Sequence, residues 1–171
     1  MTIKQFAIAL GLTLLSTFNA LASDDLTIDA QEQDLNFKKN TMFFKGNVQI
    51  NQGSMKIKAD ELYVITKDGA AEKLIAKGSP ATFSQSSSEG DELEANATEV
   101  IYLVNERILE LRGSAKYRQG GSVVDSANGN ITFDLENKRV KAVGGTENNG
   151  RVTTTIKIKP KTNNEKDSGN D

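Results

Sequence analysis

Residues 46–53 read Gly-Asn-Val-Gln-Ile-Asn-Gln-Gly, and residues 113–120 repeat that outline as Gly-Ser-Ala-Lys-Tyr-Arg-Gln-Gly. Each segment opens on a glycine, alternates between apolar and polar residues, and closes on a Gln-Gly turn signal. Alternation with a period of two is typical of a β-strand that buries one face. A glycine within a strand usually marks a bend or a close approach of backbones. The two segments therefore predict strands that start at a corner and end at a turn.

The corner glycine recurs at nearly constant intervals along the chain. Four similar segments end, with spacings of 32, 35 and 32 residues, at Gly46, Gly78, Gly113 and Gly145. From Leu26 onward no segment shows a sustained helical period, so the sequence predicts an all-β chain. Repeats of 32–35 residues favour a solenoid of stacked short antiparallel strands that bury one continuous apolar strip. An ordinary β-sandwich whose segments are similar by coincidence is the alternative.

The composition excludes several classes of function. The chain has 171 residues, which suits one domain, and it contains no His and no Cys. A Ser-His-Asp triad, a thiolate nucleophile, a disulfide and the common zinc sites are therefore excluded. The balance of 21 Lys and Arg against 23 Asp and Glu, without a basic block, argues against nucleic acid as a partner. The composition favours a binding or structural protein with no metal and no cofactor.

Paired carboxylates are the remaining candidates for catalysis. They occur at residues 24–25, 60–61 and 91–92, beside turn signals or near a terminus. A polysaccharide-cleaving enzyme would need two such groups that converge on one face. Neighbouring residues of a strand point to opposite faces, so these pairs do not converge. We therefore predict that the protein is not an enzyme.

The two ends of the chain differ from its body. Residues 1–22 combine a positive start, an apolar stretch and the small residues Ala20 and Ala22, which is the pattern of a signal peptide cleaved before Ser23. An uncleaved anchor is the alternative, although the apolar stretch is shorter than the roughly 20 residues of a membrane span. Residues 23–160 form the single predicted domain. Residues 161–171 contain no apolar residue and are predicted to be a disordered polar tail.

Alternation assigns the apolar side chains of the strands to one interior face. Val48 and Ile50, for example, point away from the side to which Asn47 and Gln49 point. Residues 62–65 and 100–104 are apolar at both odd and even positions, so alternation does not show which of their side chains point inward. The side chains predicted to line the interior groove are Ile28, Phe37, Met42, Phe44, Val48, Ile50, Met55, Ile57, Phe83, Leu93, Tyr117, Ile131, Phe133 and Leu135.

Two strand candidates would lie at opposite ends of such a stack, at residues 26–30 and 151–158. An end strand presents unpaired backbone groups with which another chain can pair. Head-to-tail pairing would be heterologous and could grow into a filament. A terminal segment that folds over one end as a cap is the alternative. The predicted edge residues are Leu26 and Ile28 at one end, and Val152, Thr154 and Ile156 at the other.

Residues 46–60, 78–83 and 151–155 resemble the OstA-like β-jellyroll family of lipopolysaccharide transport proteins, and the similarity covers residues 26–159. The resemblance implies a periplasmic protein of Gram-negative bacteria with an open, V-shaped β-jellyroll. It implies that lipopolysaccharide is carried from the inner to the outer membrane with its acyl chains in an apolar groove. The implied partners are lipopolysaccharide, an inner-membrane anchored sister protein of the same fold, an outer-membrane translocon, and further copies of the chain stacked head to tail.

The sister protein keeps its N-terminal helix, so the cleavage site at Ala22 decides between the two members of that family. A structural β-solenoid, such as an envelope scaffold without lipid, is the alternative function. Its interior should be tightly closed, whereas a lipid carrier needs an interior that a ligand can enter.

Overall fold

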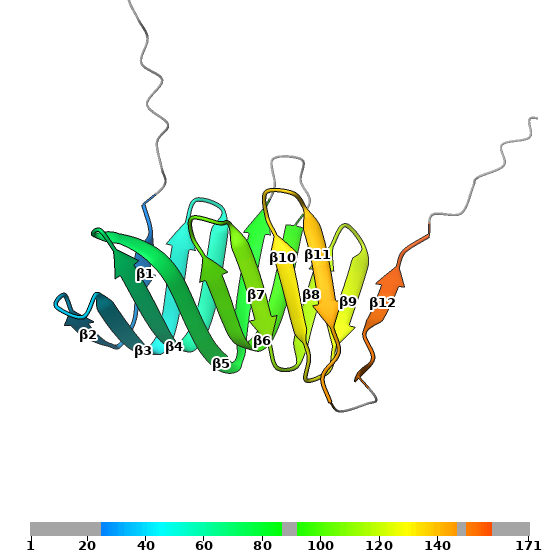
Figure 1. Ribbon diagram of the computed structural model, residues 1–171, viewed down its shortest axis with the longest axis horizontal. Coiled ribbons are helices and arrows are strands. Elements are labelled where there is room, and N and C mark those ends of the chain that lie inside the picture. Colours follow the sequence, from blue (N-terminus) through cyan, green and yellow to red (C-terminus); the bar gives the residue numbers. More distant parts are fainter. Residues whose placement is uncertain (1–24, 87–91, 147–149, 159–171) are drawn as a thin grey trace, which may run out of the picture.

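The structure is a computed structural model that describes residues 25–86, 92–146 and 150–158. The predicted signal peptide and polar tail lie outside these residues. The described chain folds into one 12-stranded antiparallel sheet (Figure 1). Its strands are β1 (Thr27–Asp29), β2 (Glu32–Asn36), β3 (Thr41–Gln52), β4 (Met55–Lys67), β5 (Ala70–Ser86), β6 (Glu92–Leu103), β7 (Ile108–Arg112), β8 (Ala115–Gln119), β9 (Ser122–Ser126), β10 (Asn130–Asp134), β11 (Arg139–Val143) and β12 (Thr153–Ile156).

The strands β3 to β6 are longer than the short strands predicted from the sequence, with 12 to 17 residues each. Each bends in its middle, so its two ends belong to different halves of the sheet. The pairing register shifts at the bends, between Lys45 and Val48 in β3 and between Lys77 and Ala81 in β5. Strand β6 then pairs with β7 along one of its ends and with β8 along the other.

The bends divide the sheet into two half-sheets. The first half-sheet contains β2, β7, β10, β11 and residues 41–45, 61–67, 70–77 and 99–103 of the long strands. The second contains β1, β8, β9, β12 and residues 48–52, 55–59, 81–86 and 92–97. The rings of Tyr117 in the second and Phe133 in the first lie 5.1 Å apart, so the half-sheets face each other. This arrangement is the open β-jellyroll expected from the sequence.

Three of the four predicted corner glycines, Gly46, Gly78 and Gly113, lie at the bends, whereas Gly145 follows the end of β11. Gly46 and Gly113 have φ angles of +82° and +71°, a region that glycine adopts without a steric penalty. At Gly78 an added Cβ would lie 2.9 Å from the backbone nitrogen of Ala81, so the close approach excludes a side chain. The Gly113 carbonyl accepts a hydrogen bond of 2.8 Å from the amide of Thr98, which ties the corner of β6 to the corner between β7 and β8.

Small side chains fill the interior beside the corners of the second half-sheet. Cross-strand partners there include Ala81 with Ala97 and Ala115 with Ser126, and all four are almost fully buried. Ser126 is the one buried polar residue in the described chain, and its Oγ donates a hydrogen bond of 2.9 Å to the Val143 carbonyl.

Candidate functional site

Two rows of apolar side chains face each other between the half-sheets and run along the whole stack. Each row follows cross-strand partners, which brings residues far apart in sequence into one line. In the second half-sheet the row consists of Ile28, Ile50, Ile57, Phe83, Ala95, Tyr117 and Val124. In the first half-sheet it consists of Met42, Val64, Leu74, Tyr102, Leu109, Phe133 and Val140. Together they form a continuous apolar layer, called the interior groove below.

Most side chains predicted to line the groove point into this layer. Ten of them are exposed by 6 % or less: Phe44, Val48, Ile50, Met55, Ile57, Phe83, Leu93, Tyr117, Ile131 and Phe133. Ile28, Met42 and Leu135 are partly buried against the same cluster. The side chains therefore pack against one another in this structure, and the interior groove is closed along most of its length.

Phe37 does not belong to the groove. It lies in the turn between β2 and β3 and is 71 % exposed. Residues 37–40 form a turn, in which side chains do not alternate between two faces as they do in a strand, so Phe37 has no inward position to occupy.

In the first half-sheet the sequence reasoning found the inward residues of β3 and β10 but missed those of β4 to β7. The missed side chains, all buried, are Leu62, Val64, Leu74, Val100, Tyr102, Leu109 and Leu111. Residues 62–65 and 100–104 have apolar side chains on both faces, so alternation could not choose between the two parities there. The signal that could have assigned them is the cross-strand register from the turns, because Val64 and Tyr102 both pair with Leu74.

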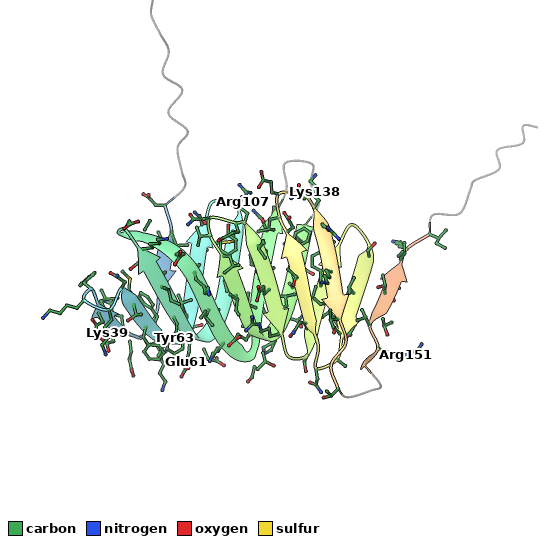
Figure 2. The ribbon with its side chains drawn as sticks, in the orientation of Figure 1. Lys39, Glu61, Tyr63, Arg107, Lys138 and Arg151 are labelled. Carbon is green, nitrogen blue, oxygen red and sulfur yellow. The ribbon has the colours of Figure 1, made fainter. Side chains whose placement is uncertain are left out.

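The side of the molecule opposite the corners is open, and a cavity of about 470 Å³ lies there. Figure 2 shows Arg107 and Lys138 at this edge and Glu61 at the edge that carries the corners. Both half-sheets contribute to the cavity, which we call the mouth. Its lining residues are Gln52, Ser54, Met55 and Gln85 from the second half-sheet and Tyr102, Val104, Asn105 and Arg107 from the first.

The mouth combines an apolar floor with a polar rim. Met55 and Tyr102 are buried by more than nine-tenths, and both also belong to the apolar cluster of the interior. Burial raises the pKa of the Tyr102 hydroxyl, and the nearby Arg107 guanidinium lowers it in part. No backbone hydrogen bond of the described chain joins the two lips of the mouth. An apolar chain could therefore enter here without breaking the sheet.

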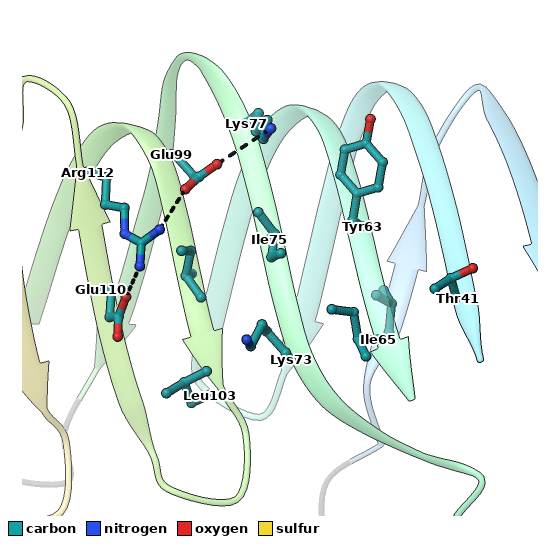
Figure 3. A pocket seen from close by; sticks show the side chains of 12 residues that line it. Thr41, Tyr63, Ile65, Lys73, Ile75, Lys77, Glu99, Leu103, Glu110 and Arg112 are labelled. Carbon is teal, nitrogen blue, oxygen red and sulfur yellow. Dashed lines mark hydrogen bonds and ion pairs between the residues drawn. The ribbon is translucent and has the colours of Figure 1, made fainter. Parts of the chain in front are cut away.

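A second hollow, of about 550 Å³, lies on the outer face of the first half-sheet (Figure 3). Its floor carries Tyr63, Ile75 and Ile101, which are cross-strand partners in one row. Along one wall the Glu99 carboxylate pairs with Lys77 at 3.5 Å and with Arg112 at 3.6 Å. In the two apolar runs, 62–65 and 100–104, the side chains that point outward line this hollow, namely Tyr63, Ile65, Ile101 and Leu103.

The carboxylate pair at Asp60 and Glu61 lies at a corner, and Asp60 is exposed. In residues 25–86, 92–146 and 150–158, His, Cys, Asp and Glu side chains form no group of three or more that could hold a metal ion. The same ranges contain no helix that is long and apolar enough to span a membrane.

The predicted edge residues lie at the two ends of the stack. Ile28 is in β1, which pairs only with β3, and Thr154 and Ile156 are in β12, which pairs only with β9. Leu26 and Val152 directly precede these strands. Figure 1 shows β1 and β2 at one end of the molecule and β12 at the other. The Ile156 side chain is 67 % exposed, so its end of the stack presents an apolar edge.

Comparisons with known proteins give consistent matches. Residues 27–139 match the family described as LptA/(LptD N-terminal domain) LPS transport protein. The lipopolysaccharide export system protein LptA of Haemophilus influenzae is 31 % identical over 155 residues, which cover 86 % of this chain and 88 % of the relative. The protein of the same name from Escherichia coli is 30 % identical over 132 residues, covering 75 % of this chain and 69 % of the relative.

The fold also matches a solved structure. The crystal structure of LptH, the LptA-homologous periplasmic component of the lipopolysaccharide transport device of Pseudomonas aeruginosa, superposes with a TM-score of 0.72. The match covers 79 % of this chain and 96 % of that one at 21 % sequence identity, and it supports the β-jellyroll assignment.

Proposed function

This chain belongs to the LptA/(LptD N-terminal domain) LPS transport protein family, and from that premise we propose that it carries lipopolysaccharide through the periplasm. The observation that carries the proposal is the pair of facing apolar rows, which run without interruption along the stack and open at the mouth. Acyl chains are costly to expose to water, at about 0.8 kcal/mol for each CH₂ group. A trough that is open on one side shields the chains and leaves the sugars outside.

Entry of the acyl chains requires the lips of the mouth to part, because the groove side chains pack against one another. Parting the lips exchanges contacts between side chains for contacts between side chains and acyl chains. The apolar area removed from water is largely conserved in this exchange, so its cost in free energy is small. The backbone pairing at the corners, where Thr98 binds the Gly113 carbonyl, stays intact and acts as the hinge.

The ends of the stack provide the route between the membranes. β1 and β2 at one end and β11 and β12 at the other each offer a free strand edge, and pairing of unlike ends joins copies head to tail. Through the same edges the chain binds an inner-membrane sister protein of the same fold and an outer-membrane translocon. The chain performs no catalysis, and the energy for transport comes from its partners.

Photocrosslinking in cells tests the proposal. A photoreactive residue at Ile50 or Phe133, both inward-facing, should form an adduct with lipopolysaccharide. The same residue at Lys56, the outward neighbour of Met55 and Ile57 on β4, is the matched control and should form none. Adducts at Lys56 but at no inward position would contradict the proposal.

The alternative function is an envelope scaffold that binds no lipid. The observation in its favour is the tight interior, in which Val48 and Ile50 have no exposed surface. A scaffold would show no adduct at any inward position, and its stability would not change when lipopolysaccharide is added. A carrier gains stability with ligand because only the folded chain binds it.

A further inference from the structure

The turns at the open edge of the first half-sheet form one lip of the interior groove. Three of them end on a residue whose backbone conformation is uncommon for its type. Three four-residue turns, at 37–40, 104–107 and 135–138, end on a residue with positive φ. These residues are Asn40 at +54°, Arg107 at +54° and Lys138 at +51°. Asparagine adopts this left-handed region readily, because its short side chain bonds locally. Arginine and lysine are not among the residue types that adopt this region routinely, so Arg107 and Lys138 occupy positions that glycine or asparagine would suit better.

The conformation of these turns is imposed by their neighbours. The Arg107 carbonyl accepts a hydrogen bond of 3.0 Å from the Leu135 amide, and the Asn40 carbonyl accepts one of the same length from the Thr66 amide. The amide of Val104 is bonded at 3.0 Å to the Glu72 carbonyl. Hydrogen bonds thus join the turn at 104–107 to the turn at 135–138 and to β5, so the backbone of residue 107 is held in place from both sides. Strain that the surroundings impose on an unfavourable residue points to a function for its side chain.

Arg107 differs from Lys138 in its place, because it lines the mouth. None of the residues that line the mouth is acidic, and several carry amide or hydroxyl groups, namely Gln52, Gln85, Asn105 and Ser54. Among the described residues no carboxylate forms an ion pair with Arg107. The Arg107 guanidinium therefore lies at a cavity lined by apolar and neutral hydrogen-bonding groups, and within the described ranges no carboxylate pairs with it.

We propose that Arg107 binds a phosphate group on the head group of the amphiphile whose chains enter the mouth. This inference rests on the proposed function and adds a contact to it. The planar guanidinium can donate two parallel hydrogen bonds to a phosphate, and the amide and hydroxyl side chains can complete its shell. The chains attached to the same head group then pass over Met55, Tyr102 and Val104 into the groove. One cation at the rim fixes the depth to which the lipid enters.

Substitution of Arg107→Asn separates the roles of the backbone and the side chain. Asparagine relieves the strained φ, so the melting temperature should rise by about 2–4 °C. Loss of the guanidinium should weaken binding of lipopolysaccharide about tenfold, the usual effect of removing a charge-assisted pair. Lys138→Asn is the matched control, because it makes the same change at the same turn position away from the mouth. It should raise the melting temperature without weakening binding.

The binding assay compares lipopolysaccharide with the same lipopolysaccharide after phosphatase treatment, in a buffer that contains a chelator of divalent cations. The full mature chain should lose affinity when the phosphates are removed, and R107N should bind both forms equally. Arg107→Lys keeps the charge but cannot donate two parallel hydrogen bonds. Its preference for the phosphorylated form should therefore lie between those of the native chain and R107N. If R107N still prefers the phosphorylated form as strongly as the native chain, the proposal is wrong. If the native chain binds neither form, the proposed function fails instead.

Discussion

Two glycines at positive φ differ in how closely their neighbours approach. At the corner, Gly113 combines a φ of +71° with a close approach, because an added Cβ would lie 3.0 Å from Thr98 Oγ1. At a turn, Gly120 has a φ of +57°, but nothing lies within 4 Å of its added Cβ. The two glycines therefore share a backbone requirement, and only Gly113 has a packing requirement as well.

We expect Gly113→Ala to cost about 2–3 kcal/mol of unfolding free energy and Gly120→Ala to cost about 1 kcal/mol. The shared part is the penalty for positive φ, and the excess at Gly113 is the disturbed hydrogen bond between Thr98 and the Gly113 carbonyl. Urea denaturation of both variants measures the difference. Equal losses would show that the corner does not need a close approach at Gly113.

Because Tyr117 is buried, the stability of the protein should depend on pH in the alkaline range. Burial raises the pKa of Tyr117 to about 12, from an ordinary value of 10.0. The unfolded chain ionises first, so the contribution of Tyr117 to stability is complete below pH 10 and is lost as the pH rises toward 12. Native protein should lose more stability than Tyr117→Phe between pH 8 and pH 11, as measured by urea midpoints. If both proteins lost the same stability over this pH range, Tyr117 would not be held neutral by burial in the folded chain.

At the scale of elements, the bent strands determine how the stack begins and ends. A long strand that crosses a corner serves both half-sheets, so β3 to β6 need no separate connection there. After β6 each strand is short and belongs to one half-sheet only. β7 in the first half-sheet and β8 in the second are connected through Gly113. The last strand, β12, pairs with β9 alone and exposes its side chains. This arrangement leaves free edges at both ends of the molecule.

We expect Ile156→Lys to weaken head-to-tail association about tenfold, because a lysine within a paired edge must lose its hydration. Light scattering across a range of protein concentrations measures the average size of the assemblies. Ile158→Lys, two residues beyond Ile156 and outside β12, is the control. An equal effect of both variants would mean that general surface polarity, and not pairing of β12, controls association.

At the scale of the whole molecule, the proposed function predicts that the two half-sheets move apart at the mouth and stay joined at the corners. The chain contains no native cysteine, so pairs of spin labels can be placed without background. Labels at Ser54 and Asn105, which lie on opposite lips of the mouth, should move apart when lipopolysaccharide binds. Labels at Asp60 and Ser79, which share a hollow at the corners, should keep their distance. Pulsed electron resonance measures both. A mouth distance that is unchanged by bound lipid would rule out opening of the lips.

Local patterns in the sequence were sufficient for the all-β class, the corner glycines and the inward face of the second half-sheet. Val48, Ile50 and Ile57 alternate with polar neighbours, and a strand with one polar face can bury only the other. Gly46 and Gly113 each mark a bend that requires a positive φ at the glycine itself, so the residue type alone indicates the bend. These properties belong to single strands, so a reader of the sequence can find them.

The tertiary structure alone decided the inward faces of β4 to β7 in the first half-sheet, and the mouth. In residues 62–65 and 100–104 both faces are apolar, and only the register with β5 turns Val64 and Tyr102 inward. The mouth joins Met55 to Arg107, which no local pattern connects, because the bend of the sheet brings their strand ends together. The sequence by itself thus determined the all-β class and the bends at Gly46, Gly78 and Gly113. Which residues meet across the groove depended on how the half-sheets close, since that is set by contacts between distant strands.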